Sequence, residues 1–173
     1  MSRVDTNLSI SSFIQGFGGG LRPNRFIVSI DGTAAPFHVR AASLPSATTN
    51  EIAIPYRGRV FKMPGSRSYS PWNITVLDDT STNLWGYFHT WANNIFSHTT
   101  NVGAGGNFTG VMAPITVQQL HLNGGVYKTM TLENAWPSEV GEVRLSMDDS
   151  ESLSVFSVTL QYSGYYFGSN RSR

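Results

Sequence analysis

Acidic and basic side chains are sorted into separate segments of this chain. Between residues 52 and 77 every charged residue is basic: Arg57, Arg59, Lys62 and Arg67. Between residues 133 and 151 one base, Arg144, stands among six acids: Glu133, Glu139, Glu142, Asp148, Asp149 and Glu151. That segment therefore has a net charge of five negative, six minus one. Because complementary charge fixes the register of two surfaces more than their affinity, the sorting suggests an electrostatic contact.

Three interpretations of this sorting are open. The segments could be solvated loops that neutralise each other within one subunit. The basic segment, with Tyr56, Phe61 and Tyr69 interleaved, could bind nucleic acid, although a net charge of +1 makes a weak phosphate footprint. We prefer a contact between copies, because a head-to-tail contact that does not close builds a filament. The candidate interface residues are Arg57, Arg59, Lys62, Arg67, Glu139, Glu142, Asp148 and Asp149.

Residue types that could support catalysis or metal binding show no functional spacing. The chain has no cysteine, and its four histidines lack metal-ligand spacing: His38, His89, His98 and His121. The glycines at 16, 18 and 20 lack the strand and helix that flank a phosphate loop. We therefore expect no enzyme, no cofactor and no metal. A hydrolase site assembled from distant residues is the alternative left open.

The composition indicates one soluble domain with unusually few charges. A chain of 173 residues fits a single domain, no apolar run is long enough to span a bilayer, and no signal peptide is visible. Charged residues make up 13% of the chain, against about 25% in an ordinary domain. Either the surface is rich in Ser, Thr and Asn, as in secreted or viral β proteins, or neighbouring copies cover much of it.

Alternation and turn signals predict a mainly β protein. Early strands are expected at 26–30, 37–42, 51–56, 59–63 and 72–77, with Pro64-Gly65 breaking the fourth. Two strands at 111–122 and 126–134 should flank the hairpin signal Asn123-Gly124-Gly125. The last strand, 152–167, should bury alternate residues: Phe156, Val158, Leu160 and Tyr162.

One substantial helix is expected over 79–96. Acidic and Ser/Thr residues at its start suit the positive end of a helix and its capping. Four apolar residues follow at helical spacing: Leu84, Phe88, Trp91 and Ile95. This stripe should pack over the sheet.

Long segments of the chain resemble the tail tube proteins of contractile-tailed bacteriophages. These segments are RPNRFIVSI, AASLPSATTNEIAIPYRGRVFKMPGSRSYSPWNITVLDD and NAWPSEVGEVRLSMDDSESLSVFSVTLQY. In that family an Arg-Pro-Asn entry, a Leu-Pro corner, an Ile-Pro strand, a basic loop ending in a Trp strand, a helix and a Trp-Pro-x-x-Val-Gly-Glu segment follow in this order. They map here to 22–26, 44–45, 54–55, 57–72, 79–96 and 136–142. The arm, the 99–110 loop and the tail look longer than in the shortest members.

The resemblance implies a β-barrel or sandwich of two packed antiparallel sheets with one flanking α-helix. Six copies would form a ring whose inner strands join into one barrel, and rings would stack into a tube. The expected partners are a sheath protein, baseplate and tail-terminator proteins, a tape-measure protein, and DNA that passes through the lumen without specific binding. No membrane partner is implied. The protein would belong to the virion tail and would be in the host cytoplasm during assembly.

A lumen that conducts DNA should be neutral or acidic, because each neutralised phosphate adds affinity and slows passage. The nearly uncharged hairpin at 115–132 is therefore the candidate wall, with Gln118, Gln119, Thr129 and Thr131 facing the lumen. Lys128 should point elsewhere or be paired.

We therefore expect a structural tube subunit with an N-terminal arm (1–21), a tail tube β-barrel domain (22–167) and a C-terminal tail (168–173). The first alternative is a tube protein of another contractile injection system, such as type VI secretion, or a baseplate-proximal paralogue. A more distant alternative is a β-sandwich binding module that holds glycan or single-stranded nucleic acid through Tyr165, Tyr166 and Phe167.

Overall fold

The computed structural model describes residues 10–17, 20–30, 39–97, 103, 108–148 and 152–168, and it is mainly β, as predicted. Its strands are β1 (Phe26–Ile30), β2 (Val39–Ala42), β3 (Ala47–Tyr56), β4 (Arg59–Tyr69), β5 (Trp72–Leu77), β6 (Ala113–Leu120), β7 (Val126–Val140), β8 (Val155–Gln161) and β9 (Gly164–Phe167). The helices are α1 (Ile10–Gly16), α2 (Leu84–Ile95) and a short 3-10 turn, η1 (Phe108–Gly110).

Seven strands form one antiparallel sheet that folds over on itself at β7. The strand order is β1-β6-β7-β8-β5-β2, and β9 also pairs with β7. The first part of β7 pairs with β6 and β9, whereas its last residues, from Trp136 onward, pair with β8. The two halves pack as a sandwich, and within the described chain β1 and β2, at the two ends of the order, do not pair to close a barrel.

The backbone of β7 is irregular at Asn134, two residues before Trp136. Asn134 has φ +53°, and it lies between Glu133, which pairs with β9, and Trp136, which pairs with β8. Asn tolerates this left-handed conformation better than most residues, because its short polar side chain can bond locally. Trp136 and Pro137 lie inside the strand.

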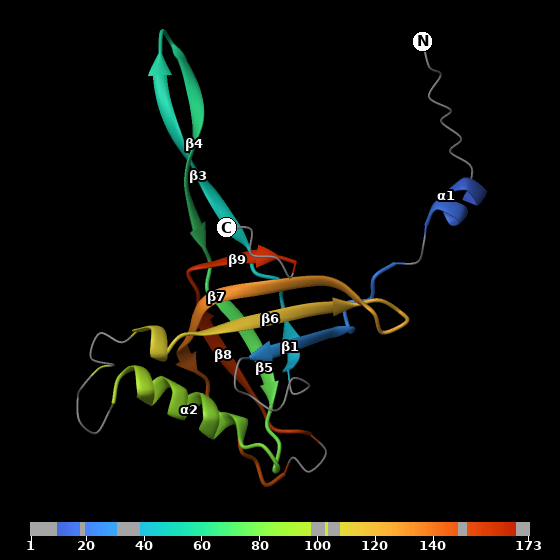
Figure 1. Ribbon diagram of the computed structural model, residues 1–173, viewed down its shortest axis with the longest axis vertical. Coiled ribbons are helices and arrows are strands. Elements are labelled where there is room, and N and C mark those ends of the chain that lie inside the picture. The colour runs from blue at the N-terminus through green and yellow to red at the C-terminus, as the bar shows by residue number, and fades with distance from the viewer. Residues whose placement is uncertain are drawn as a thin grey trace.

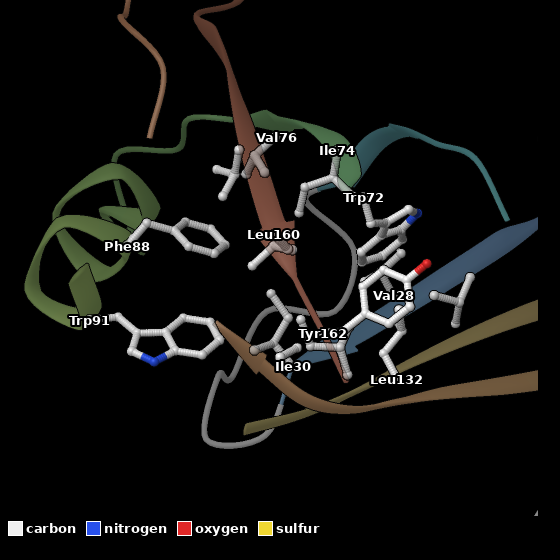
Figure 2. Packing of buried hydrophobic residues seen from close by; sticks show 14 of the residues in the cluster. Val28, Ile30, Trp72, Ile74, Val76, Phe88, Trp91, Leu132, Leu160 and Tyr162 are labelled. Carbon is white, nitrogen blue, oxygen red and sulfur yellow. The ribbon is translucent and has the colours of Figure 1, made fainter. Parts of the chain in front are cut away.

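The core fills the space between the two halves of the sheet (Figure 2). Trp72, Ile74 and Val76 alternate inward from β5, and the predicted inward residues of the neighbouring strand β8 lie beside them on the same face of the sheet. Val28 and Ile30 from β1 and Leu132 from β7 close the other side. The period-2 pattern thus predicted which side chains are buried.

Helix α2 covers one side of the sandwich, as its apolar stripe predicted. Leu84, Phe88 and Trp91 are buried, and the indole Nε1 of Trp91 donates to the carbonyl of Val111 at 2.6 Å. The start of the helix differs from the prediction. Its N-cap is Asn83, whose side-chain oxygen accepts from the Gly86 amide, and no acidic residue lies in the first turn.

Strands β3 and β4 form a separate two-stranded hairpin that extends away from the sandwich along the long axis of the molecule (Figure 1). The predicted break at Pro64-Gly65 is wrong, because β4 continues to Tyr69. The pairing register shifts between Thr49 and Glu51, opposite this dipeptide, so the proline lies at an irregularity in an edge strand that tolerates it. The basic segment is therefore mostly a hairpin and not a loop.

Several further segments can be compared with the prediction from the sequence. The last predicted strand is divided into two strands, because β8 ends at Gln161 and β9 begins at Gly164; both pair antiparallel with β7. The arm contains α1, which the sequence did not predict. The Asn123-Gly124-Gly125 hairpin is confirmed, with Gly124 at φ +84°. Residues 31–38, between β1 and β2, lie outside the described residues, as does most of the 99–110 loop.

Candidate assembly surfaces

One face of the projecting hairpin carries large apolar side chains. The other, which we call the polar face because it holds the Lys62–Glu51 ion pair, also carries Ala53, Pro55 and Val60. Cross-strand pairs place Ile52 opposite Met63 and Ile54 opposite Phe61 on one face, and Tyr56 continues that face toward the tip. All five side chains are exposed, Tyr56 and Phe61 by 66% and 63%. This apolar face was missed from the sequence, although the alternation at 52, 54 and 56 could have identified it. We call it the hairpin apolar face.

The tip of the hairpin is a two-residue turn made by Arg57 and Gly58. Their φ angles are +46° and +78°, and positive φ at both central residues is the signature of a type I′ turn. Asn and Gly favour these positions, whereas an arginine there is uncommon. The Arg57 guanidinium lies over the Tyr56 ring, 5.5 Å from its centroid. The turn therefore holds one cation at the far end of the molecule.

The other predicted basic residues lie along β4. Lys62 is on the polar face, where its Nζ is 2.7 Å from the Glu51 carboxylate, so part of its charge is matched within the hairpin. Arg59 pairs with Tyr56 next to the tip. Arg67 pairs with Thr49, closer to the body. Arg57 and Arg59 are thus the basic side chains nearest the tip.

The predicted acidic residues lie in and after the last part of β7. Glu139 is exposed in the strand and accepts a long hydrogen bond, 3.5 Å, from Thr159 Oγ1. Glu142 lies 3.8 Å from the side chain of Arg144, but both groups are more than 80% exposed, so the pair contributes little. Asp148 is exposed as well, and Asp149 lies outside the described residues.

A groove of about 790 Å³ opens beside one of these carboxylates, that of Glu142. Its walls include Arg40, Glu142, Leu145, Leu153 and Phe156. Leu145 and Leu153 are 89% and 73% exposed, which is unusual for leucines of a folded chain. The groove therefore combines apolar side chains with one carboxylate, Glu142, and two cations, Arg40 and Arg144.

The hairpin and the groove lie at opposite ends of the long axis. Figure 1 shows β3 and β4 projecting from one end, while the segment between β7 and β8 lies at the other end. Among the described residues, the two ion pairs that we find each join neighbours within one segment and do not link the segments. Neutralisation of the two segments within one subunit therefore has no support in this geometry.

The outward face of the half-sheet formed by β1, β6, β7 and β9 carries polar side chains. It also holds the carboxylate of Glu133, which alternates with Thr131, and the apolar Ile27 opposite Gln118. Register places Gln118 opposite Thr129 and Thr116 opposite Thr131, and the hydroxyl oxygens of the two threonines are 3.5 Å apart. Ser29 of β1 and Tyr166 of β9 extend this face on its two sides. We call Ser29, Thr116, Gln118, Thr129, Thr131 and Tyr166 the polar sheet face.

Three of the four predicted lumen residues belong to the polar sheet face by register, but one of them, Thr131, is buried, with 8% of its surface exposed. Gln119 does not, because it alternates with Gln118 and pairs with Lys128 on the opposite face. Lys128 thus points away from the polar sheet face, and its Nζ lies 5.2 Å from the centroid of the Tyr127 ring.

A cluster of tyrosines joins the base of the hairpin to the sandwich. The Tyr69 ring at the end of β4 lies 5.6 Å from the ring of Tyr162 and the same distance from that of Tyr165. The Tyr162 hydroxyl donates to the Ser46 carbonyl at 3.4 Å. Burial, followed by the proximity of Tyr165 and Tyr69, raises the pKa of Tyr162 above its usual value of 10.0. The cluster fixes where the hairpin leaves the body.

The described part of the chain holds no group of three or more His, Cys, Asp or Glu side chains that could bind a metal ion. No helix in that part is long and apolar enough to cross a membrane. The surfaces that stand out in the described residues are the hairpin, the groove and the polar sheet face.

Solved structures of contractile injection machines share this fold. One is the sheath-tube complex of an extracellular contractile injection system, PVC, in its extended state; its matching chain has a TM-score of 0.62 and 21% identity over 92% of this chain and 97% of its own length. Another is the baseplate of the anti-feeding prophage, 6-fold symmetrised. Its matching chain has a TM-score of 0.64 and 15% identity over 86% of this chain and 95% of its own length. At these identities the likeness establishes the fold alone.

The family is established by sequence. The family model for phage tail tube proteins matches residues 29–168. The tail tube protein of Serratia phage KSP90 is 29% identical over 90% of this chain and 93% of its own length. Tail tube protein gp19 of Enterobacteria phage T4 is 26% identical over 83% of this chain and 89% of its own length. The chain therefore belongs to the phage tail tube protein family, and it is a structural protein, not an enzyme.

Proposed function

We propose that this chain forms six-membered rings that stack into the tube of a phage tail, with a lumen that conducts DNA at ejection. The observation that carries the proposal is the placement of the hairpin and the groove at opposite ends of the molecule. A surface that meets a different surface of an identical copy propagates in one direction. A subunit built in this way suits a filament of stacked rings.

In the proposed stack the tip of the hairpin enters the groove of a copy in the next ring. Arg57 and Arg59 would then face Glu139, Glu142 and the 148–149 carboxylates, while Leu145 and Leu153 would meet apolar side chains of the hairpin. Apolar burial would supply most of the free energy of stacking. The charges would select the register.

Within a ring, the outer strands are suited to join neighbouring copies. In the described chain β1 and β2 are each paired on one side only, because they stand at the ends of the strand order. Pairing between copies would cover these edges, which explains how a chain with 13% charged residues avoids unspecific edge association.

The polar sheet face is our proposal for the lumen wall. It offers hydroxyls and one amide without a cation, so passing phosphates would find no site to hold them. Gln118, Thr129 and Thr131 remain lumen candidates, and Gln119 is proposed to face away. A tape-measure protein would occupy this space before DNA does.

The proposed partners along the outside and at the ends are a sheath protein, a baseplate and a terminator. Structures with this fold come from a sheath-tube complex, a baseplate and a tube-terminating cap. We place the protein in a phage rather than in another injection system because its relatives at 26–29% identity are phage tail tube proteins. Assembly would take place in the host cytoplasm.

Electron microscopy of the purified chain tests the proposal. We expect rings and tubes from the unchanged protein, and rings without tubes from the variant that carries Arg57→Glu and Arg59→Glu. Adding Glu139→Arg and Glu142→Arg to that variant should restore tubes, because the charges are then exchanged across the contact. Arg67→Glu, closer to the body, is the matched control and should elongate nearly normally.

Two outcomes would contradict parts of the proposal. Normal tubes from the Arg57→Glu, Arg59→Glu variant would show that the tip charges are solvated and do not take part in stacking. A protein that stays monomeric at high concentration, with its arm intact, would argue against the tube itself.

A further inference from the structure

Helix α1 carries an apolar stripe that the described part of its own chain leaves exposed. Ile10, Phe13, Ile14 and Phe17 recur at helical spacing and are 79%, 65%, 66% and 55% exposed. The rings of Phe13 and Phe17 stack on each other, 5.2 Å apart, and neither residue belongs to the core cluster. A helix of 7 residues is too short to be stable without packing against something else.

The hairpin apolar face also lacks a packing partner in the described chain. A two-stranded hairpin is at best marginally stable in water, and it gains stability when a helix packs against one face. Ile52, Ile54 and Phe61 are 54%, 42% and 63% exposed, so nothing in the described chain fills that role. One chain therefore contains an uncovered helix and an uncovered two-stranded face.

We infer that α1 of one copy packs its apolar stripe on the hairpin apolar face of a second copy. Figure 1 shows α1 and the hairpin on separate sides of the molecule, which favours a neighbour over the same chain as the occupant. The inference rests on the proposed function, because a tube supplies the second copy. The hairpin would then make two contacts: its tip would contact the groove of a neighbouring copy, and its apolar face would contact α1 of a neighbouring copy.

The two contacts of the hairpin differ in their physical nature. Residues 10–17 contain no charged side chain, so the contact of α1 with the hairpin is apolar and should persist at high salt. The contact of Arg57 and Arg59 with carboxylates should weaken as salt increases. The arm would thus hold copies together under conditions that loosen the tip.

Disulfide trapping between two differently tagged copies tests the inference, and the chain has no cysteine of its own. One copy carries Phe13→Cys with a mass tag, and the other carries Ile54→Cys without it. Mixed under assembling conditions and mildly oxidised, they should give a heterodimer that contains both chains. The matched control is Ala53→Cys, which points to the polar face of the same strand and should give at least tenfold less heterodimer.

A second variant tests the same contact, with the melting temperature of the monomer as the control for folding. Phe13→Ser and Ile14→Ser together should raise the protein concentration needed for tubes about tenfold or more, as expected for two exposed apolar side chains that lose a buried partner. The melting temperature of the monomer should not change, because α1 is outside the core.

Each outcome has a separate meaning. Tubes without a 13–54 heterodimer would overturn the docking of the arm and leave the tube intact. A chain that carries both cysteines and closes on itself as a monomer would show that the arm covers its own hairpin. Absence of tubes from the unchanged protein would instead overturn the proposed function.

Discussion

Gly141 lies against Ser157 of β8 with no room for a side chain. A β-carbon at Gly141 would come within 2.8 Å of the Ser157 carbonyl oxygen and 3.3 Å of its amide nitrogen. The Gly141 amide also donates to that carbonyl at 2.7 Å. The glycine therefore holds the chain that leaves β7 against β8, within the acidic segment.

We predict that Gly141→Ala destabilises the monomer by about 1–3 kcal/mol, because backbone atoms cannot yield as a flexible side chain would. Thermal unfolding measures this as a lower melting temperature. Gly16→Ala is the control, since a β-carbon there meets no atom within 4 Å. Equal melting temperatures for both variants would contradict the close packing.

The sequence predicted the sandwich well, because burial sets a period of two along its strands. Trp72, Ile74 and Val76 alternate inward as expected, and the helix stripe at Phe88 and Trp91 packs over the sheet. The prediction failed where residues that usually end a strand lie inside a strand that is paired with its neighbour. Pro64 lies within β4 because the register of an exposed hairpin shifts there.

The candidate site was only partly accessible from the sequence. The sorting of charge along the chain identified the segments that contain Arg57 and Glu142. Only the fold shows that these segments lie at opposite ends of the molecule. The hairpin apolar face was hidden for another reason. Alternating apolar residues such as Ile52 and Ile54 suggest burial in the chain's own core, and sequence alone does not distinguish that core from a contact with another copy.

We predict that Arg57→Asn separates the shape of the hairpin tip from its charge. Asn suits a position with φ +46° at least as well as Arg, so monomer stability should be unchanged or should rise by a few tenths of a kcal/mol. Tube assembly should nevertheless weaken, and its salt dependence should decrease, because one cation is lost. The measurement is the lowest protein concentration that gives tubes at two salt concentrations. Arg57→Lys, which keeps the charge, should assemble more readily than Arg57→Asn.

We predict that Gln118→Lys leaves tube assembly intact but slows the passage of DNA. The substitution adds a cation to the polar sheet face in every copy, and each neutralised phosphate adds salt-dependent affinity. The measurement is the rate of DNA release from particles that carry the variant, at low and high salt. Asn93→Lys, on an exposed position of α2, adds the same charge elsewhere and should not change the rate. An unchanged rate for Gln118→Lys would argue that the lumen wall lies on another face.

We predict that Tyr162 makes the monomer less stable in alkaline solution. Its pKa is raised in the folded state, mainly by burial, so the folded chain holds this proton more tightly than the unfolded chain does. The contribution of Tyr162 to the free energy of unfolding is therefore fully present below pH 10 and is lost as the pH rises through the higher folded value. Denaturant unfolding between pH 7 and pH 11 measures the effect, and Tyr162→Phe should flatten the decline because the titrating hydroxyl is gone. Tyr127→Phe removes the hydroxyl of an exposed tyrosine and serves as the control. If the two variants declined equally with pH, the tyrosine cluster at the base of the hairpin would not be the origin of the alkaline sensitivity.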